Sequence, residues 1–364
     1  MAIALAVLLA CCASAAVAQF ENGISFSEGS TNAAKPTQSA ATTFIVNQQN
    51  CRCVLIGTCA FNGNNGIDIR IVNVGTTPSP CQTGYQSCCT PPTSQPSTVP
   101  PADTTCGIRK IPVTRQPVVG QASFGAYPWQ AALLTKAGEN YLGSGVLMDA
   151  THVVTAAHKV AAYANNPEAM LVRLGDWNGR ASTEPYQPVS VNVARVVLHP
   201  NFNSVNLDND VAVIRLNGVV PIASYPNINT ACKPTAAVVA NQRCYVSGWG
   251  KNAFAPNGQY QAIMREVDVP IIDQASCEAR LRQTRLGPNF VLNRNSFICA
   301  GGESGKDACT GDGGSPLVCQ TNTGQWQVVG LVAWGIGCAN TNVPGVYTNF
   351  WNFLPWINAA ITTA

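Results

Sequence analysis

Cysteines constrain the folding of this chain more than any other residue type. Of the sixteen cysteines, Cys11 and Cys12 lie in an apolar N-terminal run, six crowd into residues 51–89, and eight follow residue 105. A span as short as 51–89 cannot build a stable core without covalent cross-links. The fourteen cysteines beyond residue 18 are an even number suited to seven disulfides, which is typical of an oxidising compartment.

The N-terminus has the composition of a secretory signal. Residues 1–18 are mostly apolar and end in Ala16-Val17-Ala18, a small-residue pattern typical of signal cleavage sites. The run is too short to cross a bilayer, and no later apolar run is long enough. We therefore expect cleavage after Ala18 and a secreted, extracellular protein. An uncleaved N-terminal anchor is the alternative, because the run lacks an early Lys or Arg.

Composition disfavours several classes of function. The chain has 364 residues, of which 46% are hydrophobic, enough to bury the core of at least one full-sized domain. Only 11% are charged and the net charge is +3, which leaves no dense basic patch for nucleic acid. A zinc site is the competing interpretation of the clustered cysteines, but the adjacent pair Cys88-Cys89 favours disulfides. We expect no nucleic-acid partner, no metal and no cofactor.

Composition changes along the chain predict separate domains. Residues 19–50 are rich in Ser, Thr, Ala, Asn and Gln without a helical or strand period, so we expect a flexible segment. The cysteine-rich module 51–89 follows, and within it residues 67–72 alternate as a strand would. Residues 90–115 are rich in Pro and Thr, which indicates an exposed linker.

The rest of the chain predicts an antiparallel β structure. Short β-rich runs such as 191–197 and 327–332 alternate with Gly, Pro and Asn turns. Residues 116–364 resemble the trypsin-like serine protease family, which implies an all-β fold of two six-stranded antiparallel barrels with a short C-terminal helix. Four segments carry the resemblance by their order and spacing: Pro128-Trp129-Gln130, Val153–His158, Asp208–Leu216 and Asp307–Pro316.

This resemblance implies a catalytic constellation without its nucleophile. It assigns His158 as the base and Asp210 as the carboxylate that orients it, in the order His, Asp, Ser that the family uses. The family sequence Gly-Asp-Ser-Gly-Gly-Pro is replaced by Gly-Asp-Gly-Gly-Ser-Pro over residues 311–316, so Gly313 occupies the nucleophile position. Glycine has no side chain that can attack a carbonyl. The resemblance therefore implies a pseudo-protease with no functional catalytic residue.

Ser315 is a poor replacement for the lost serine. Two residues along the chain displace it by roughly 5 to 7 Å, whereas attack on a carbonyl tolerates errors of about 1 Å. Removal of the triad serine typically costs about 10⁶ in turnover. An active protease with an unusual nucleophile remains the alternative. His152 and His199 match no motif and are expected to be structural.

Two further departures affect the same site. The family bridges a cysteine before the histidine loop to one directly after the histidine, and here those positions hold Gly143 and Lys159. We expect a looser His158 loop, because such a disulfide is worth about 3 kcal/mol. The family serine that helps to hold the triad carboxylate is replaced by Ala333, so Asp210 is expected to lose one hydrogen-bond partner.

Resemblance also supplies a disulfide pattern that spacing alone cannot. The cysteine layout of residues 51–89 allows fifteen pairings and resembles the arthropod clip domain. The clip family implies the pairs Cys51–Cys88, Cys53–Cys81 and Cys59–Cys89. The trypsin-like family implies the pairs Cys106–Cys232, Cys244–Cys319, Cys277–Cys299 and Cys309–Cys338.

A substrate-like pocket and a processing site are further expectations. Asp307 lies where trypsin-like enzymes place the carboxylate that receives Lys or Arg, and Gly335 and Gly345 match the open pocket walls. The alternative is a solvated or internally paired relic. Arg115 is a plausible cleavage site for a trypsin-like enzyme, although the following Gln116-Pro117 lacks the usual aliphatic terminus that pairs with the aspartate equivalent to Asp312.

Clip-bearing homologues of this kind act in arthropod haemolymph as cofactors for prophenoloxidase activation, which supports melanisation and innate immunity. The resemblance implies prophenoloxidase and a clip-domain activating protease as partners, and a homo-oligomer after cleavage is a further hypothesis. Besides the active endopeptidase, the alternative is a pattern-recognition or adhesion protein that binds microbial surface polysaccharide.

Overall fold

The computed structural model describes two separate parts of the chain. Backbone strands are described for residues 43–46, 49–55 and 85–89; the second part comprises residues 104–114, 116, 118–180, 184–251, 258–306, 312–337 and 340–363. The chain divides into two compact units, and residues Ser30–Pro101 form one of them. The signal segment 1–18 and the strand expected at 67–72 lie outside the described residues.

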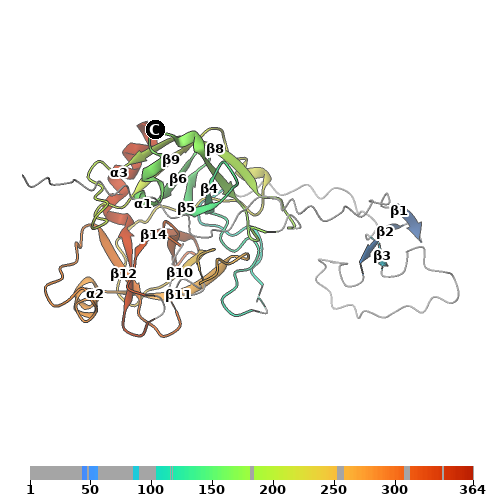
Figure 1. Ribbon diagram of the computed structural model, residues 1–364. Coiled ribbons are helices and arrows are strands. Elements are labelled where there is room, and N and C mark those ends of the chain that lie inside the picture. The colour runs from blue at the N-terminus through green and yellow to red at the C-terminus, as the bar shows by residue number, and fades with distance from the viewer. Residues whose placement is uncertain are drawn as a thin grey trace, which may run out of the picture. The chain divides into compact units, whose positions relative to one another are not determined.

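The smaller unit contains a three-stranded antiparallel sheet (Figure 1). Strand β1 (Thr43–Val46) pairs with β2 (Gln49–Leu55), which pairs with β3 (Tyr85–Cys89). The sheet begins before the boundary predicted at residue 51, because the β-branched and aromatic run of β1 pairs with β2. That run belongs to the segment predicted to be flexible, so the prediction is wrong for Thr43–Val46.

The register of this sheet brings cysteines of distant sequence together. Cys51 on β2 lies opposite Cys89 on β3, and Arg52 lies opposite Cys88. The cysteine side chains of this unit lie outside the described residues. The three pairs implied for the clip module therefore stay predictions.

Six strands form the first barrel of the larger unit (Figure 1). They close in the order β4-β5-β6-β9-β8-β7, and alternate residues of β7, such as Met170, Val172 and Leu174, point into the core. The strand bounds are Gln130–Thr135 (β4), Tyr141–Asp149 (β5), His152–Thr155 (β6), Met170–Leu174 (β7), Val189–Leu198 (β8) and Ala212–Leu216 (β9).

Six more strands form the second barrel, which closes in the order β10-β11-β12-β15-β14-β13. Their bounds are Arg243–Gly248 (β10), Arg265–Ile272 (β11), Phe297–Gly301 (β12), Pro316–Gln320 (β13), Trp326–Trp334 (β14) and Pro344–Asn349 (β15). The predicted all-β fold of two six-stranded barrels is confirmed. The strands expected at 191–197 and 327–332 lie within β8 and β14.

The helices are short except for the last. Helix α1 (Ala157–Val160) follows β6, and single 3₁₀ turns occupy residues 161–163, 167–169 and 222–224. Helix α2 (Gln274–Leu281) begins at the N-cap Asp273, whose carboxylate accepts a hydrogen bond from the Ser276 amide at 2.9 Å. The C-terminal helix α3 (Phe350–Thr363) confirms the expected helical end.

Helix α3 closes the fold over both barrels. It contacts β14 and β9, and its buried face consists of Phe350, Phe353, Ile357 and Ala360. These residues join a core cluster shared by the two barrels. Trp129 and Trp249 are fully buried in that cluster, so the interface between the barrels is itself hydrophobic core.

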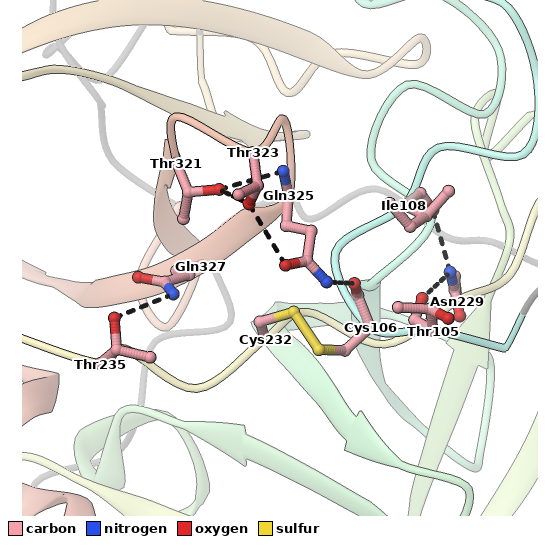
Figure 2. Close-up of a disulfide and its surroundings, with 10 residues drawn as sticks. All are labelled: Thr105, Cys106, Ile108, Asn229, Cys232, Thr235, Thr321, Thr323, Gln325 and Gln327. Atoms are coloured by element: carbon pink, nitrogen blue, oxygen red, sulfur yellow. Dashed lines mark hydrogen bonds between the residues drawn. A yellow bond between two sulfur atoms is a disulfide. The ribbon is translucent and has the colours of Figure 1, made fainter.

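Among the described residues, three disulfides cross-link the larger unit. They join Cys106 to Cys232, Cys244 to Cys319, and Cys277 to Cys299, the same pairs that the family resemblance implies. The Cys309–Cys338 pair lies outside the described residues. The first disulfide connects the segment before the barrels to the body of the domain (Figure 2).

Hydrogen bonds reinforce that connection (Figure 2). The Asn229 side-chain amide donates to the carbonyls of Thr105 and Ile108, and the Gln325 amide donates to the carbonyl of Cys106. Gly107 is in the left-handed region at φ 71°, and a Cβ there would lie 2.5 Å from the Trp326 carbonyl oxygen. Only glycine lets this segment approach the barrel so closely.

Two cations anchor the segment further. The Lys110 ammonium donates to three backbone carbonyls, of Ile222, Tyr225 and Ile228. The Arg109 guanidinium lies 4.1 Å from the ring centre of Trp326, within range of a cation–π interaction. Residues 105–110 are therefore part of the barrel domain rather than of the linker predicted at 90–115.

A buried carboxyl pair lies in the loop after β7. Asp176 is only 6% exposed, and Arg173 approaches it no closer than 3.9 Å. Burial raises the pKa of Asp176 to about 7, with a further contribution from the charge of Glu184. Glu184 accepts a hydrogen bond from the Trp177 amide at 2.9 Å, and burial raises its pKa as well.

Replacement of Asp176 with Asn tests this burial. The folded carboxyl titrates near pH 7 and the unfolded one near 3.8, so between these values the folded state holds a proton that the unfolded state releases. As the pH rises through this window, the free energy of unfolding of the wild-type protein should therefore fall by about 4 kcal/mol relative to that of Asp176→Asn. Above the window, the difference between the two proteins should stay constant. Denaturant unfolding of both proteins over this pH range measures the difference. Asp208→Asn, in a surface loop, is the control; a pH-independent difference for Asp176→Asn would contradict the assignment.

Candidate functional site

His158 and Asp210 form a hydrogen-bonded pair in the first barrel. His158 lies in α1, directly after β6, and Asp210 lies just before β9. The Asp210 carboxylate is fully buried; one oxygen lies 2.6 Å from His158 Nδ1 and the other accepts from the His158 amide at 2.8 Å. A proton on Nδ1 satisfies this contact and leaves Nε2 available, as a catalytic base requires.

The Asp210 backbone is also held by the second barrel. Thr348 on β15 donates its hydroxyl to the Asp210 carbonyl at 2.8 Å. Ala333 is buried and brings no hydroxyl to the site. Within the described part of the chain, both donors to the Asp210 carboxylate come from His158. The pair is therefore positioned without the serine that the family places at residue 333.

Gly313 lies directly against His158. A Cβ on Gly313 would lie 2.8 Å from His158 Nε2 and 2.8 Å from Lys159 Cδ, closer than real Cβ atoms approach other heavy atoms. The Gly313 carbonyl accepts a hydrogen bond from the Ser144 amide of β5 at 3.1 Å, which ties the turn to the first barrel. The site is thus closed around a residue without a side chain.

Lys159 fills the space next to Gly313. A Cβ on Gly143 would lie 2.4 Å from Lys159 Cε and 2.8 Å from the Gly313 carbonyl oxygen. Burial lowers the pKa of the Lys159 amine, while the charges of Asp312 and Asp210 act in the opposite direction. The Lys159 stem packs in the space between Gly143 and Gly313, and the looser His158 loop expected from the missing disulfide stays a prediction.

Ser315 is directed into the core. Its side chain is fully buried, and its hydroxyl lies 3.4 Å from the Gln130 amide nitrogen. Gln130 also donates to the Ser247 carbonyl at 3.0 Å and accepts from the Ser247 hydroxyl at 3.0 Å. This buried network leaves Ser315 no path to an incoming carbonyl.

The Asp312 carboxylate packs against the end of β10. It accepts a hydrogen bond from the Gly250 amide at 2.9 Å. A Cβ on Gly248 or Gly250 would lie within about 2.5 Å of this carboxylate, so glycines at both positions allow its close approach.

The pocket residues are only partly described. Gly345 lies on β15 opposite Ala300, and Gly335 directly follows β14. Among the described residues, a Cβ on Gly335 would meet only the Gly337 carbonyl oxygen, at an ordinary 3.5 Å. Asp307, the expected base of the pocket, lies outside the described residues, so the pocket stays a prediction.

The cleavage candidate Arg115 also lies outside the described residues, but its neighbours are placed. The Thr114 amide and the Gln116 side chain both donate to the Ser123 hydroxyl, at 3.2 and 3.3 Å. Val119 is 91% exposed, so the aliphatic run after the candidate site lies at the surface.

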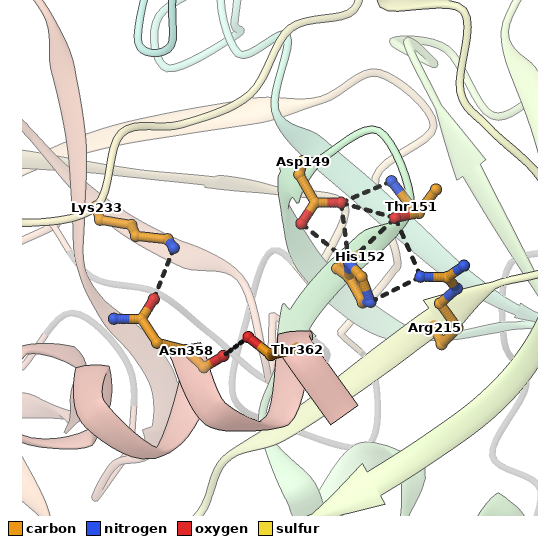
Figure 3. Close-up of polar contacts among 7 residues, drawn as sticks. All are labelled: Asp149, Thr151, His152, Arg215, Lys233, Asn358 and Thr362. Carbon is orange, nitrogen blue, oxygen red and sulfur yellow. Dashed lines mark hydrogen bonds and ion pairs between the residues drawn. The ribbon is translucent and has the colours of Figure 1, made fainter. Parts of the chain in front are cut away.

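The remaining histidines have structural surroundings. His152 is buried, and its ring contacts the Asp149 carboxylate at 2.9 Å and an Arg215 nitrogen at 3.3 Å (Figure 3). His199 packs against the rings of Phe353 and Trp356 of α3. No group of three or more potential metal ligands occurs among the described residues.

The fold and the site define the class of protein. Residues 118–357 match the trypsin family, and the two barrels carry the His158–Asp210 pair of that family. The chain belongs to the trypsin family. Within the described ranges, no helix combines the length and apolarity that a membrane crossing requires.

Curated relatives define the kind of family member. The chain is 45% identical over 334 residues to "Inactive CLIP domain-containing serine protease A3" of Aedes aegypti, covering 87% of this chain and 68% of the relative. It is 40% identical over 254 residues to "Phenoloxidase-activating factor 2" of Galleria mellonella, covering 66% and 82%. It is 37% identical over 235 residues to anionic trypsin of Canis lupus familiaris, covering 64% and 84%. The chain is a non-catalytic clip-domain serine protease homologue.

Sequence reasoning predicted His158, Asp210 and Gly313 as the triad positions but missed the part that Lys159 plays. The sequence showed that both cysteines were lost. The available signal was the pairing of a long side chain, Lys159, at one of these positions with a glycine, Gly143, at the other. Only the packing shows that the stem of Lys159 contacts Gly143 and Gly313 at once.

Substitution of Gly313 tests whether the site is closed. Gly313→Ala should lower the free energy of unfolding by about 1–3 kcal/mol, the usual cost of overpacking a well-packed region. Gly335→Ala is the matched control, because its Cβ meets only an ordinary contact within the described part of the chain. Denaturant unfolding measures both variants, and equal effects would show that the space beside His158 is open.

Proposed function

We propose that this protein is a secreted, non-catalytic cofactor in a proteolytic immune cascade that activates prophenoloxidase. The observation that carries the proposal is the closure of the site around Gly313, where His158 and Lys159 occupy the space of the missing side chain. A protein of this family without a nucleophile contributes by binding. The relative named phenoloxidase-activating factor 2 supports the assignment of the pathway.

The retained scaffold supports a binding role. The two barrels, their shared core and three disulfides give a rigid surface that does not depend on catalysis. We assign prophenoloxidase and a clip-domain activating protease as partners, with haemolymph as the compartment. Assembly into a homo-oligomer after cleavage is part of the same proposal.

Cleavage after Arg115 is the proposed control step. A cut there would leave residues 105–110 attached to the barrel domain through Cys106–Cys232, the Asn229 amide and the Lys110 ammonium. The cut cannot switch on chemistry in a site without a nucleophile. Its effect is therefore confined to the new chain ends beside Ser123 and to the surface that they uncover.

Reconstitution tests this function. Purified prophenoloxidase and its activating protease are combined with and without this protein, and phenoloxidase activity is measured. We expect activity to rise with the wild-type protein and to stay at the level without cofactor for Arg115→Gln, with secretion and thermal stability unchanged.

The matched control is Arg285→Gln, the same substitution at an arginine that is exposed in the barrel domain. It should behave as wild type. Full cofactor activity from uncleaved Arg115→Gln protein would overturn the control step, and no effect of the wild-type protein would overturn the cofactor role. Pull-down on peptidoglycan or glucan, without effect on phenoloxidase, would instead support the recognition role.

A further inference from the structure

We propose that Lys159 is a second block on catalysis, separate from the missing serine, because its aliphatic stem occupies the space that side chains at residues 143 and 313 would need. The protein would then remain inactive even with a serine at the nucleophile position. The proposal does not depend on the cofactor function.

The packing around Lys159 carries the argument. Its Cδ lies 2.8 Å from the Cβ position of residue 313, and its Cε lies 2.4 Å from the Cβ position of residue 143. Two segments from different barrels therefore contact the same stem. The Lys159 stem fits because residues 143 and 313 are both glycines. Lys159, Gly143 and Gly313 therefore form one interdependent packing arrangement.

The His158 ring is the second group that a side chain at residue 313 would meet. His158 Nε2 lies 2.8 Å from the Cβ position of residue 313, and the ring is held at Nδ1 by the buried Asp210 carboxylate at 2.6 Å. A serine at residue 313 would have to displace both this ring and the lysine stem. With the stem removed, only the ring has to move, by a few tenths of an ångström, which is within the error of about 1 Å that reaction geometry tolerates.

Charge alone does not hold Lys159 in its inward position. Burial lowers the pKa of its amine and so disfavours the ammonium, while the Asp312 and Asp210 carboxylates attract the ammonium and offset part of this effect. The stem, rather than the charge, meets the Cβ positions of residues 143 and 313. A neutral side chain of similar length should therefore block the serine as lysine does.

The rest of the catalytic base is in place. Both oxygens of Asp210 bind His158, and within the described residues no hydrogen bond or ion pair involves Nε2. An active nucleophile would therefore find an oriented base as soon as the lysine stem is removed. The role of Lys159 can therefore be tested by restoring a reactive serine at residue 313, in addition to measuring the loss of stability.

The experiment is a double-mutant cycle on the full-length protein. Gly313→Ser is introduced beside Lys159, beside Lys159→Met, which keeps a long stem without charge, and beside Lys159→Ala, which removes the stem. Denaturant unfolding measures stability, and the rate of labelling by an organofluorophosphonate measures the reactivity of the new serine.

We expect strong coupling between residues 313 and 159. Gly313→Ser should increase the unfolding equilibrium constant at least tenfold beside Lys159 or Met, and by less than threefold beside Ala. Labelling should be at least tenfold faster with Ala than with either long side chain. Ser315→Ala in the doubly substituted protein should leave labelling unchanged, because Ser315 is buried.

Several outcomes would overturn the proposal. Additive stability effects would show that the stem does not occupy the space. Equal labelling in the Lys159 and Ala backgrounds, including no labelling in either, would show that Lys159 is not the remaining block. If Lys159→Met releases the serine as fully as Lys159→Ala, the charge rather than the stem is responsible, and the steric proposal fails.

Discussion

The contact between the first barrel and the turn at residues 312–315 is the constraint on which the site depends. The Ser144 amide binds the Gly313 carbonyl, and His158 lies against Gly313 without space for a side chain. The two barrels share a hydrophobic core, so this contact cannot relax without disturbing the interface between them. The packing around residue 313 therefore leaves no space for a serine side chain, so the change at this position involves more than the loss of one hydroxyl.

The protein keeps the geometry of a catalytic pair whose chemistry it cannot use. Asp210 is fully buried, and a buried carboxylate is costly unless it is hydrogen-bonded. His158 supplies both bonds through its amide and its ring. The pair therefore has a structural reason to persist, since removal of the histidine would leave an uncompensated carboxylate between the barrels.

The segment before the barrels is held to the barrel domain by several independent contacts. Its disulfide to Cys232 is accompanied by the Lys110 contacts with three carbonyls and by the stacking of Arg109 on Trp326. Residues 105–110 are therefore fixed to the barrel domain by several independent contacts. The N-terminal boundary of the barrel domain is therefore set by these contacts and not by the end of the proline-rich composition.

The sequence by itself determined the double barrel and the non-catalytic class of the protein, and it predicted the roles of His158, Asp210 and Gly313, because each rests on residue order within recognisable motifs. Tertiary structure decided that the stem of Lys159 fills the space left by the lost cysteines and that Ser315 points into the core. It also placed β1 ahead of the predicted module boundary. These outcomes depend on distances between segments far apart in the chain, which only the packing of the folded protein sets.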